Sequence, residues 1–192
     1  MLATSQHTLC QYKVQVLLHG ASAANVLEKK ETLLSRGFEG NYLTSAPHIN
    51  FFYMNLSTEW EQDFAEALCM HAERIRPFLV KVGGLESHEK SGTLFMPVKT
   101  KSAICAANRE LYNQTIKRLQ HNAFPIHKPV FVENPHITIV SGLSPSDLQT
   151  AKRILSQKTF DFAFQVSKLS MVRHTPGKLG SELILEAKFM GD

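Results

Sequence analysis

Two histidines, each preceded by proline and followed by a strand-like run, are the residues of this chain best suited to acid–base chemistry. They stand in Pro47-His48-Ile49-Asn50-Phe51-Phe52 and in Pro135-His136-Ile137-Thr138-Ile139-Val140. Imidazole has an unperturbed pKa of about 6.5, so one ring can take a proton from an attacking oxygen while the other gives a proton to a leaving oxygen. Groups on two facing strands suit in-line displacement at phosphorus, in which the attacking and leaving oxygens lie on opposite sides.

Each histidine should share one face of its strand with a polar residue two positions further on. Side chains alternate along a strand, so Asn50 accompanies His48 and Thr138 accompanies His136, while the isoleucines between them face a core. An amide and a hydroxyl can both donate hydrogen bonds to non-bridging phosphate oxygens. We therefore predict His48 and His136 as the acid–base pair and Asn50 and Thr138 as phosphate-binding residues; the alternative for Asn50 is a structural hydrogen bond at the strand edge. This arrangement requires no metal and no cofactor.

The elements that must position these residues repeat along the chain. Hydrophobic periodicity predicts, for the first half, a strand over 11–19, a helix over 21–35, the strand of His48, a helix over 59–75, and strands over 78–85 and 93–98 that form a hairpin. For the second half it predicts a helix over 106–120, a loop over 125–134, the strand of His136, a helix from Ser144 to about Ser156, and strands over 160–169 and 183–189.

This order indicates an internal duplication. The two histidines are 88 residues apart (136 − 48), a repeat length at which two similar lobes can face each other across a cleft. We predict a single bilobal domain over residues 1–192, with halves of roughly 11–100 and 101–192. Pseudo-twofold symmetry would then bring the two histidine-bearing faces together.

Composition and charge narrow the classes of protein that fit. Hydrophobic residues make up 43% and charged residues 20%, as in ordinary globular domains. The net charge of +4 suits an anionic ligand. The three cysteines have neither zinc-site nor disulfide spacing. We see no signal-like N-terminus and no apolar run of membrane-spanning length, so we expect a cytoplasmic protein that does not bind membranes.

Paired His-x-Thr/Ser motifs, each on a strand in one half of a duplicated α/β lobe, are the signature of the 2H phosphoesterase superfamily, which this chain resembles from residue 11 to Phe189. That superfamily includes RNA 2′,3′-cyclic phosphodiesterases and 2′-5′ RNA ligase-like proteins. The resemblance implies an α+β fold with two mainly antiparallel sheets facing a central cleft and helices outside. It also implies metal-independent phosphodiester chemistry on 2′,3′-cyclic phosphate or 2′-5′-linked RNA. Asn50 departs from the pattern, which usually has Thr or Ser there.

Three functional interpretations remain open at this stage. The first is a phosphodiesterase acting on RNA ends or 2′-5′ linkages. The second is a viral or phage type of 2H enzyme that degrades 2′-5′ oligoadenylate or cyclic oligonucleotide immune signals. The third is a nucleotide- or RNA-binding module without turnover, which Asn50 permits. The motifs do not assign which histidine is the base, nor do they separate hydrolysis from ligation. The expected partner is RNA or a small nucleotide, and we expect a monomer.

Four further residues are candidates for lining the cleft. Tyr42 precedes the first histidine strand, and Lys99, Lys101 and Arg173 lie after or around the two predicted hairpins. The alternative interpretation is a core position for Tyr42 and solvated positions for the three cations. The remaining histidines, His88 among them, show no metal-site spacing and are interpreted as surface or satisfied core groups.

Overall fold

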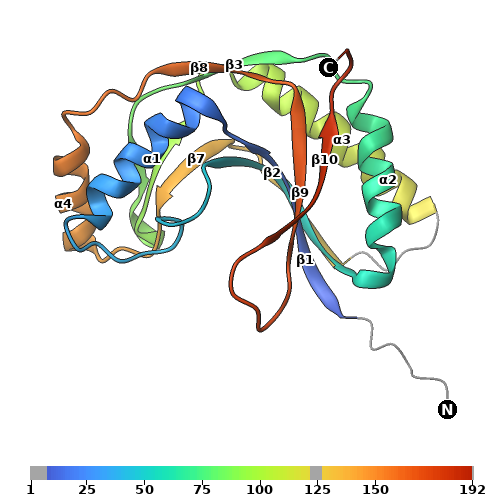
Figure 1. Ribbon diagram of the computed structural model, residues 1–192, viewed down its shortest axis with the longest axis horizontal. Coiled ribbons are helices and arrows are strands. Elements are labelled where there is room, and N and C mark those ends of the chain that lie inside the picture. Colours follow the sequence, from blue (N-terminus) through green and yellow to red (C-terminus); the bar gives the residue numbers. More distant parts are fainter. Residues whose placement is uncertain (1–7, 122–126, 192) are drawn as a thin grey trace.

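The computed structural model describes residues 8–121 and 127–191, which form the helices and strands drawn in Figure 1. The first part of the chain comprises β1 (Leu9–Leu17), α1 (Gly20–Leu34), β2 (His48–Ser57), α2 (Glu61–Ala72), β3 (Phe78–Val82), β4 (Glu86–His88) and β5 (Thr93–Pro97). The second comprises α3 (Lys101–His121), β6 (His127–Phe131), β7 (His136–Val140), α4 (Pro145–Leu155), β8 (Phe162–Val166), β9 (Lys168–His174) and β10 (Glu182–Lys188). Short 3₁₀ turns, Thr58–Trp60 and Glu89–Ser91, precede α2 and β5.

Two antiparallel sheets make up the β structure of the described residues. The larger has eight strands in the order β10-β9-β1-β2-β7-β5-β4, with β6 pairing to β2, and the smaller is the pair β3-β8. Helices flank the sheets on both sides of the view in Figure 1, α1 beside α4 and α2 beside α3. The predicted α+β class with antiparallel sheets and outer helices is confirmed.

The two halves of the repeat interlock rather than lie apart. The helix that leads into each histidine strand contacts the histidine strand of the other half: α1 contacts β7, and α3 contacts β2. The strands cross over as well, because β9 of the second half pairs with β1 and β5 of the first half pairs with β7. Each half therefore completes the other's sheet, and the larger sheet runs without interruption through both histidine strands.

The predicted hairpin of 78–85 with 93–98 is wrong. β3 pairs with β8, while β5 pairs with β4 and β7, and a single bridge between Val82 and Val98 is what joins the two segments. The chain turns after Val82 at Gly83 and Gly84, and Gly84 has a φ of 79° that favours glycine. That turn separates β3 from β4 and sends them to different sheets.

Local signals for the other elements agree better with the structure. The helix predicted from Ser144 starts as expected: Ser144 Oγ accepts a hydrogen bond from Asp147 N at 3.2 Å, and Pro145 fills the first turn. Part of the predicted loop 125–134 is strand β6; its residues 125 and 126 lie outside the described residues. The strand predicted over 160–169 is divided between β8 and β9. None of the described helices is both long and apolar enough to cross a bilayer.

Candidate active site

The pairing of β2 with β7 is the feature that brings the two histidine motifs together. These strands are antiparallel neighbours with Ile49 opposite Ile137, and both isoleucines are fully buried. The register therefore sets His48 beside Thr138 and Asn50 beside His136 on the opposite face. His48 and His136 are diagonal neighbours in this register. In a regular ladder, residues in that relation lie roughly 7–8 Å apart. The two imidazoles thus flank one position on the sheet surface, as in-line displacement at phosphorus requires.

Both histidine strands carry a β-bulge at the same place. Opposite β1, the register of β2 passes from Asn50 to Phe52 and leaves out Phe51. Opposite β5, the register of β7 passes from Thr138 to Val140 and leaves out Ile139. The extra residue and its successor are buried in each case, because the bulge turns both toward the core. Each bulge ends the regular alternation immediately after the polar face that carries the histidine.

Each imidazole is held by the same local hydrogen bond. Nδ1 lies 2.8 Å from the carbonyl oxygen two residues earlier, that of Ala46 for His48 and that of Asn134 for His136. A carbonyl only accepts, so Nδ1 carries the proton and donates it. The neutral ring then has its lone pair on Nε2, which is the atom that accepts a proton from a reacting group and returns it.

His48 lies among cations. Burial lowers the pKa of its imidazole below the usual range; the bond to the Ala46 carbonyl opposes this, and the charges of Lys30, Lys13 and His136 reinforce it. Burial also lowers the pKa of Lys30 to about 8, which leaves the ammonium mostly charged at neutral pH. The free protein therefore holds His48 in its neutral, proton-accepting form.

Lys30 also fixes the loop in front of His48. Its side chain is 1% exposed, and Nζ donates to the carbonyl oxygens of Tyr42 at 2.6 Å and Ser45 at 2.8 Å. Tyr42 has a φ of 73°, a left-handed conformation that costs a bulky residue on the order of 1 kcal/mol. Its ring lies 5.9 Å from that of His48. The buried ammonium thus anchors a strained aromatic residue against the imidazole.

His136 has aromatic neighbours instead. Its ring centroid lies 4.8 Å from that of Phe95 and 6.3 Å from that of His88, and His88 stacks on Phe95 at 4.6 Å. Burial lowers the pKa of His136, the bond to the Asn134 carbonyl opposes this, and a proton on His88 lowers it further.

The two polar partners of the histidines differ in how well they are satisfied. Asn50 Oδ1 is buried and has no hydrogen-bond partner among the described residues. The register places Asn50 beside His136, and a buried amide oxygen without a partner is one that a further donor could satisfy. Thr138 lies opposite Phe95 in the β5–β7 ladder, so its hydroxyl belongs to the aromatic side of the site.

A cavity of about 440 Å³ opens beside His48. Its walls come from β1, from the loop at residues 42–46 and from the β9–β10 hairpin. Tyr42, a predicted cleft-lining residue, contributes to this wall. The volume falls within the range of small-molecule sites, about 300–1,000 Å³.

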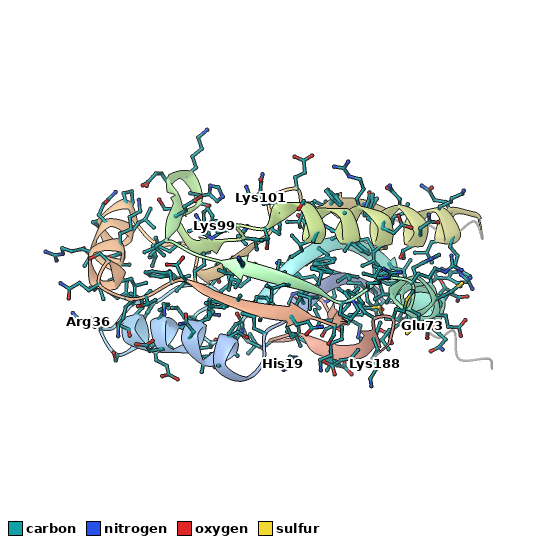
Figure 2. The ribbon with its side chains drawn as sticks, turned by 90° about the horizontal axis from the view of Figure 1, so that it is seen from above. His19, Arg36, Glu73, Lys99, Lys101 and Lys188 are labelled. Carbon is teal, nitrogen blue, oxygen red and sulfur yellow. The ribbon has the colours of Figure 1, made fainter. Side chains whose placement is uncertain are left out.

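The three predicted cleft-lining cations lie elsewhere. Arg173 follows the cavity-lining Val172 in β9 and faces α2, where Nη1 lies 2.7 Å from a carboxylate oxygen of Glu61. Lys99 lies over the glycine turn that follows β3, with Nζ 3.7 Å from the position of a β-carbon on Gly84. Lys101 is the first residue of α3, and Figure 2 shows it near Lys99. The described residues that line the cavity beside His48 do not include these three cations. No group of three or more His, Cys, Asp or Glu side chains in the described ranges could hold a metal ion.

Sequence reasoning missed four residues that the structure brings to the site: Lys13, Lys30, His88 and Phe95. One signal was available for Lys30, which occupies a buried position on the apolar stripe of α1 between Val26 and Leu33. A lysine at such a position needs several acceptors, and that requirement points to a structural or electrostatic role. The other three could be placed only through the strand order.

Comparison with known families and structures gives two kinds of match. A family model described as the 2′-5′ RNA ligase superfamily matches residues 22–178. Crystal structures of E. coli LigT with phosphate and with 3′-AMP superpose with TM-scores of 0.63 and 0.65, each at 11% identity and covering 95% of this chain and 99% of that chain. No curated protein sequence matches the chain.

Proteins from two other sources share the same fold. TT0787 of Thermus thermophilus superposes with a TM-score of 0.64 at 14% identity, covering 93% of this chain and 97% of that chain. The MHV ns2 PDE domain superposes at 0.57 with 11% identity, covering 85% of this chain and 99% of that chain. At these identities the structural likeness establishes the fold. Together with the family match, it confirms the resemblance to the 2H phosphoesterase superfamily that the histidine motifs indicated.

Proposed function

The chain belongs to the 2′-5′ RNA ligase superfamily, and on that premise we propose that it is a phosphodiesterase acting on 2′,3′-cyclic phosphate or 2′-5′-linked RNA and oligonucleotides. The observation that carries this proposal is the β2–β7 register, because it aligns two histidines with free Nε2 atoms on one face of the sheet. In E. coli LigT, which has the same fold, phosphate and 3′-AMP are bound ligands. A phosphate between the rings of His48 and His136 is consistent with that precedent.

In the proposed hydrolysis His48 is the general base and His136 the general acid. Water attacks phosphorus as its proton passes to His48 Nε2, and the new P–O bond forms. On the opposite side the bond from phosphorus to the ribose oxygen breaks, and that oxygen takes the proton of His136 Nε2. Exchange with solvent then returns His48 to the neutral form and His136 to the protonated form. Ligation is the same displacement with a 5′-hydroxyl in place of water.

The assignment of roles follows from the two environments. The positive charges of Lys30 and Lys13 disfavour a proton on His48 before substrate binds, which suits a base. Around His136 the charge that disfavours a proton is that of His88. A bound phosphate dianion or monoanion favours the protonated form of the nearest ring, and His136 is the ring less opposed by fixed cations.

Two side chains supply the remaining polar contacts to the reacting phosphate. Thr138 Oγ1 and Asn50 Nδ2 donate to the non-bridging oxygens, on which negative charge increases in the transition state. The unpartnered Oδ1 of Asn50 is then available to accept from a hydroxyl of the ribose. A Thr or Ser hydroxyl at position 50 would make this hydrogen bond to the ribose with a different geometry.

A substrate panel with product analysis tests the proposal. The protein is incubated with nucleoside 2′,3′-cyclic phosphates, RNA with cyclic-phosphate ends and 2′-5′ oligoadenylate, both with a chelator and with added Mg²⁺. We expect metal-independent turnover that His48→Ala and His136→Ala each lower by about 10²–10⁴-fold. His19→Ala, which changes an exposed histidine outside the site, should keep full activity. Activity that needs a divalent metal, or that survives both variants, would contradict the proposal.

The same panel separates the two alternatives. Preference for 2′-5′ oligoadenylate over RNA ends favours the immune-signal enzyme. Tight binding of nucleotides without any product favours the binding module. In that case Asn50→Thr, which restores the usual motif, should make activity appear.

A further inference from the structure

The cavity beside His48 contains a cation with no counter-charge. Lys13 projects from β1 into this space, and its ammonium forms no ion pair with any described residue. No Asp or Glu is among the described residues that line the cavity. Burial lowers the pKa of Lys13 because it disfavours the charged ammonium. An anion beside Lys13 would offset part of this desolvation free energy. The cavity is therefore electrostatically prepared for a negatively charged group.

Hydrogen-bonding groups accompany the cation. Gln15 also lines the cavity; its side chain is 6% exposed and has no hydrogen bond to a described residue. Ser181, immediately before β10, adds a hydroxyl to the opposite wall. A lysine, an amide and a hydroxyl around one polar cavity form the kind of donor set that phosphate oxygens accept.

The strand register shows how this cavity relates to the reacting centre. Along β1, Leu17 lies opposite His48, Gln15 opposite Asn50 and Lys13 opposite Tyr53. Lys13 is therefore about 13 Å along the strand from the residue that faces His48, at 3.3 Å per residue. Its charge is still close enough to lower the pKa of His48. Lys13 thus lies beyond the reacting phosphate, in the same cavity that His48 lines.

We propose that this cavity binds a second phosphate group of the substrate, carried by the nucleoside next to the reacting phosphate, with Lys13 as its ion-pair partner and Gln15 as a hydrogen-bond donor. The inference rests on the proposed function and narrows its substrate class. Preferred substrates are nucleotides with a further phosphate, such as oligonucleotides or 5′-phosphorylated cyclic nucleotides. Bare nucleoside 2′,3′-cyclic monophosphates bind less well.

Binding of two non-reacting nucleotides tests the site without turnover. Calorimetry compares adenosine 3′,5′-bisphosphate with adenosine 3′-monophosphate on the wild-type protein, Lys13→Met, Lys13→Arg and Lys188→Met. Lys188 is an exposed lysine at the far end of β10 from the cavity, so its variant controls for the loss of one positive charge. We expect the wild-type protein to prefer the bisphosphate by about tenfold or more, the scale of one charge-assisted hydrogen bond.

Lys13→Met should bind both nucleotides equally, whereas Lys13→Arg and Lys188→Met should keep the preference. Equal binding by the wild-type protein, or an unchanged preference in Lys13→Met, would overturn the proposal. Circular dichroism of each variant checks that the fold is retained. If Lys13→Met fails to fold, Lys13→Gln takes its place with the same expectation.

A kinetic comparison separates failure of this site from failure of the proposed catalysis. Values of kcat/KM are measured for a nucleoside 2′,3′-cyclic phosphate with and without a 5′-phosphate. A bisphosphate preference in binding, with no turnover of either cyclic phosphate or of 2′-5′ oligoadenylate, supports the second phosphate site and rejects the phosphodiesterase. Equal turnover of both substrates, with no bisphosphate preference in binding, leaves the phosphodiesterase standing and rejects the site.

Discussion

Around His48 the neighbours are cationic and one wall is an open cavity, whereas around His136 the neighbours are aromatic. Both rings nevertheless start from the same local structure: a preceding proline, an Nδ1 hydrogen bond of 2.8 Å to a carbonyl two residues earlier, and a bulge three residues later. The backbone parts of the site are duplicated, and the side chains that surround them are not. The repeat supplies the symmetry of two opposed rings, and the surroundings supply the asymmetry that an acid and a base need.

The interlocked fold explains how the asymmetry arises without disturbing the pair. Lys30 reaches the His48 side from α1, and Lys13 reaches it from β1. Phe95 and His88 reach the His136 side from β5 and β4. These elements lie at the flanks of the β2–β7 pair, so their side chains can differ while the central register stays the same.

The largest effect is expected from replacing each histidine and changing the leaving group. His48→Gln and His136→Gln should each lower kcat/KM on a ribose-leaving substrate by about 10²–10⁴-fold. On a p-nitrophenyl phosphodiester, whose leaving group needs no proton, His136→Gln should recover most of its activity and His48→Gln should not. If His48→Gln is the variant that regains activity on this substrate, the acid and base roles are reversed. If neither variant regains activity, the assignment of His48 as base and His136 as acid is rejected.

The two phosphate donors should differ by a smaller margin. Thr138→Val removes the hydroxyl but keeps the shape, and we expect kcat/KM to fall about tenfold or more because a hydrogen bond to a charged oxygen is lost. Asn50→Thr keeps a donor and should change kcat/KM by less than about threefold if the amide donates to phosphate. Steady-state kinetics on one cyclic phosphate measures both. A larger loss in Asn50→Thr than in Thr138→Val would assign the amide a contact that a hydroxyl cannot replace.

Lys30→Met should raise the pKa of His48 and leave that of His136 unchanged. Removing a neighbouring positive charge makes protonation of His48 easier, so the loss of kcat/KM on acidification should begin at a higher pH than in the wild-type protein. Proton NMR of the two imidazoles measures the first effect, and the pH profile measures the second. The variant should also be less stable to urea by about 1–3 kcal/mol, because the carbonyls of Tyr42 and Ser45 lose their donor. Equal shifts in both histidines would show that the charge acts on the whole site.

The smallest effect is expected from His88→Gln. This change removes the imidazole whose charge lowers the pKa of His136, so the pKa of His136 should rise while that of His48 stays as it was. The same NMR titration measures it. A shift of His48 instead of His136 would contradict the placement of His88 on the aromatic side.

The chemistry of the site and its local geometry could be read from residues close together in the chain. Alternation along a strand is a local property with a period of two, so the sequence alone puts His48 with Asn50 and His136 with Thr138. The bulges are also indicated by the local sequence, because two consecutive apolar residues break the alternation at corresponding positions, Phe51-Phe52 and Ile139-Val140. The length of the repeat and the family resemblance also came from sequence, and the α+β class they implied is confirmed.

Tertiary structure alone decided which strands are neighbours. The partner of a strand depends on the total burial of both sheets, which no short segment encodes, and the failed hairpin of 78–85 with 93–98 shows this limit. The strand order brought Lys13 and His88 to the histidines, whereas the Arg173 side chain contacts Glu61 in α2. The face to which a side chain points is set by its own strand. Which residues surround it is set by packing between segments that are distant in sequence.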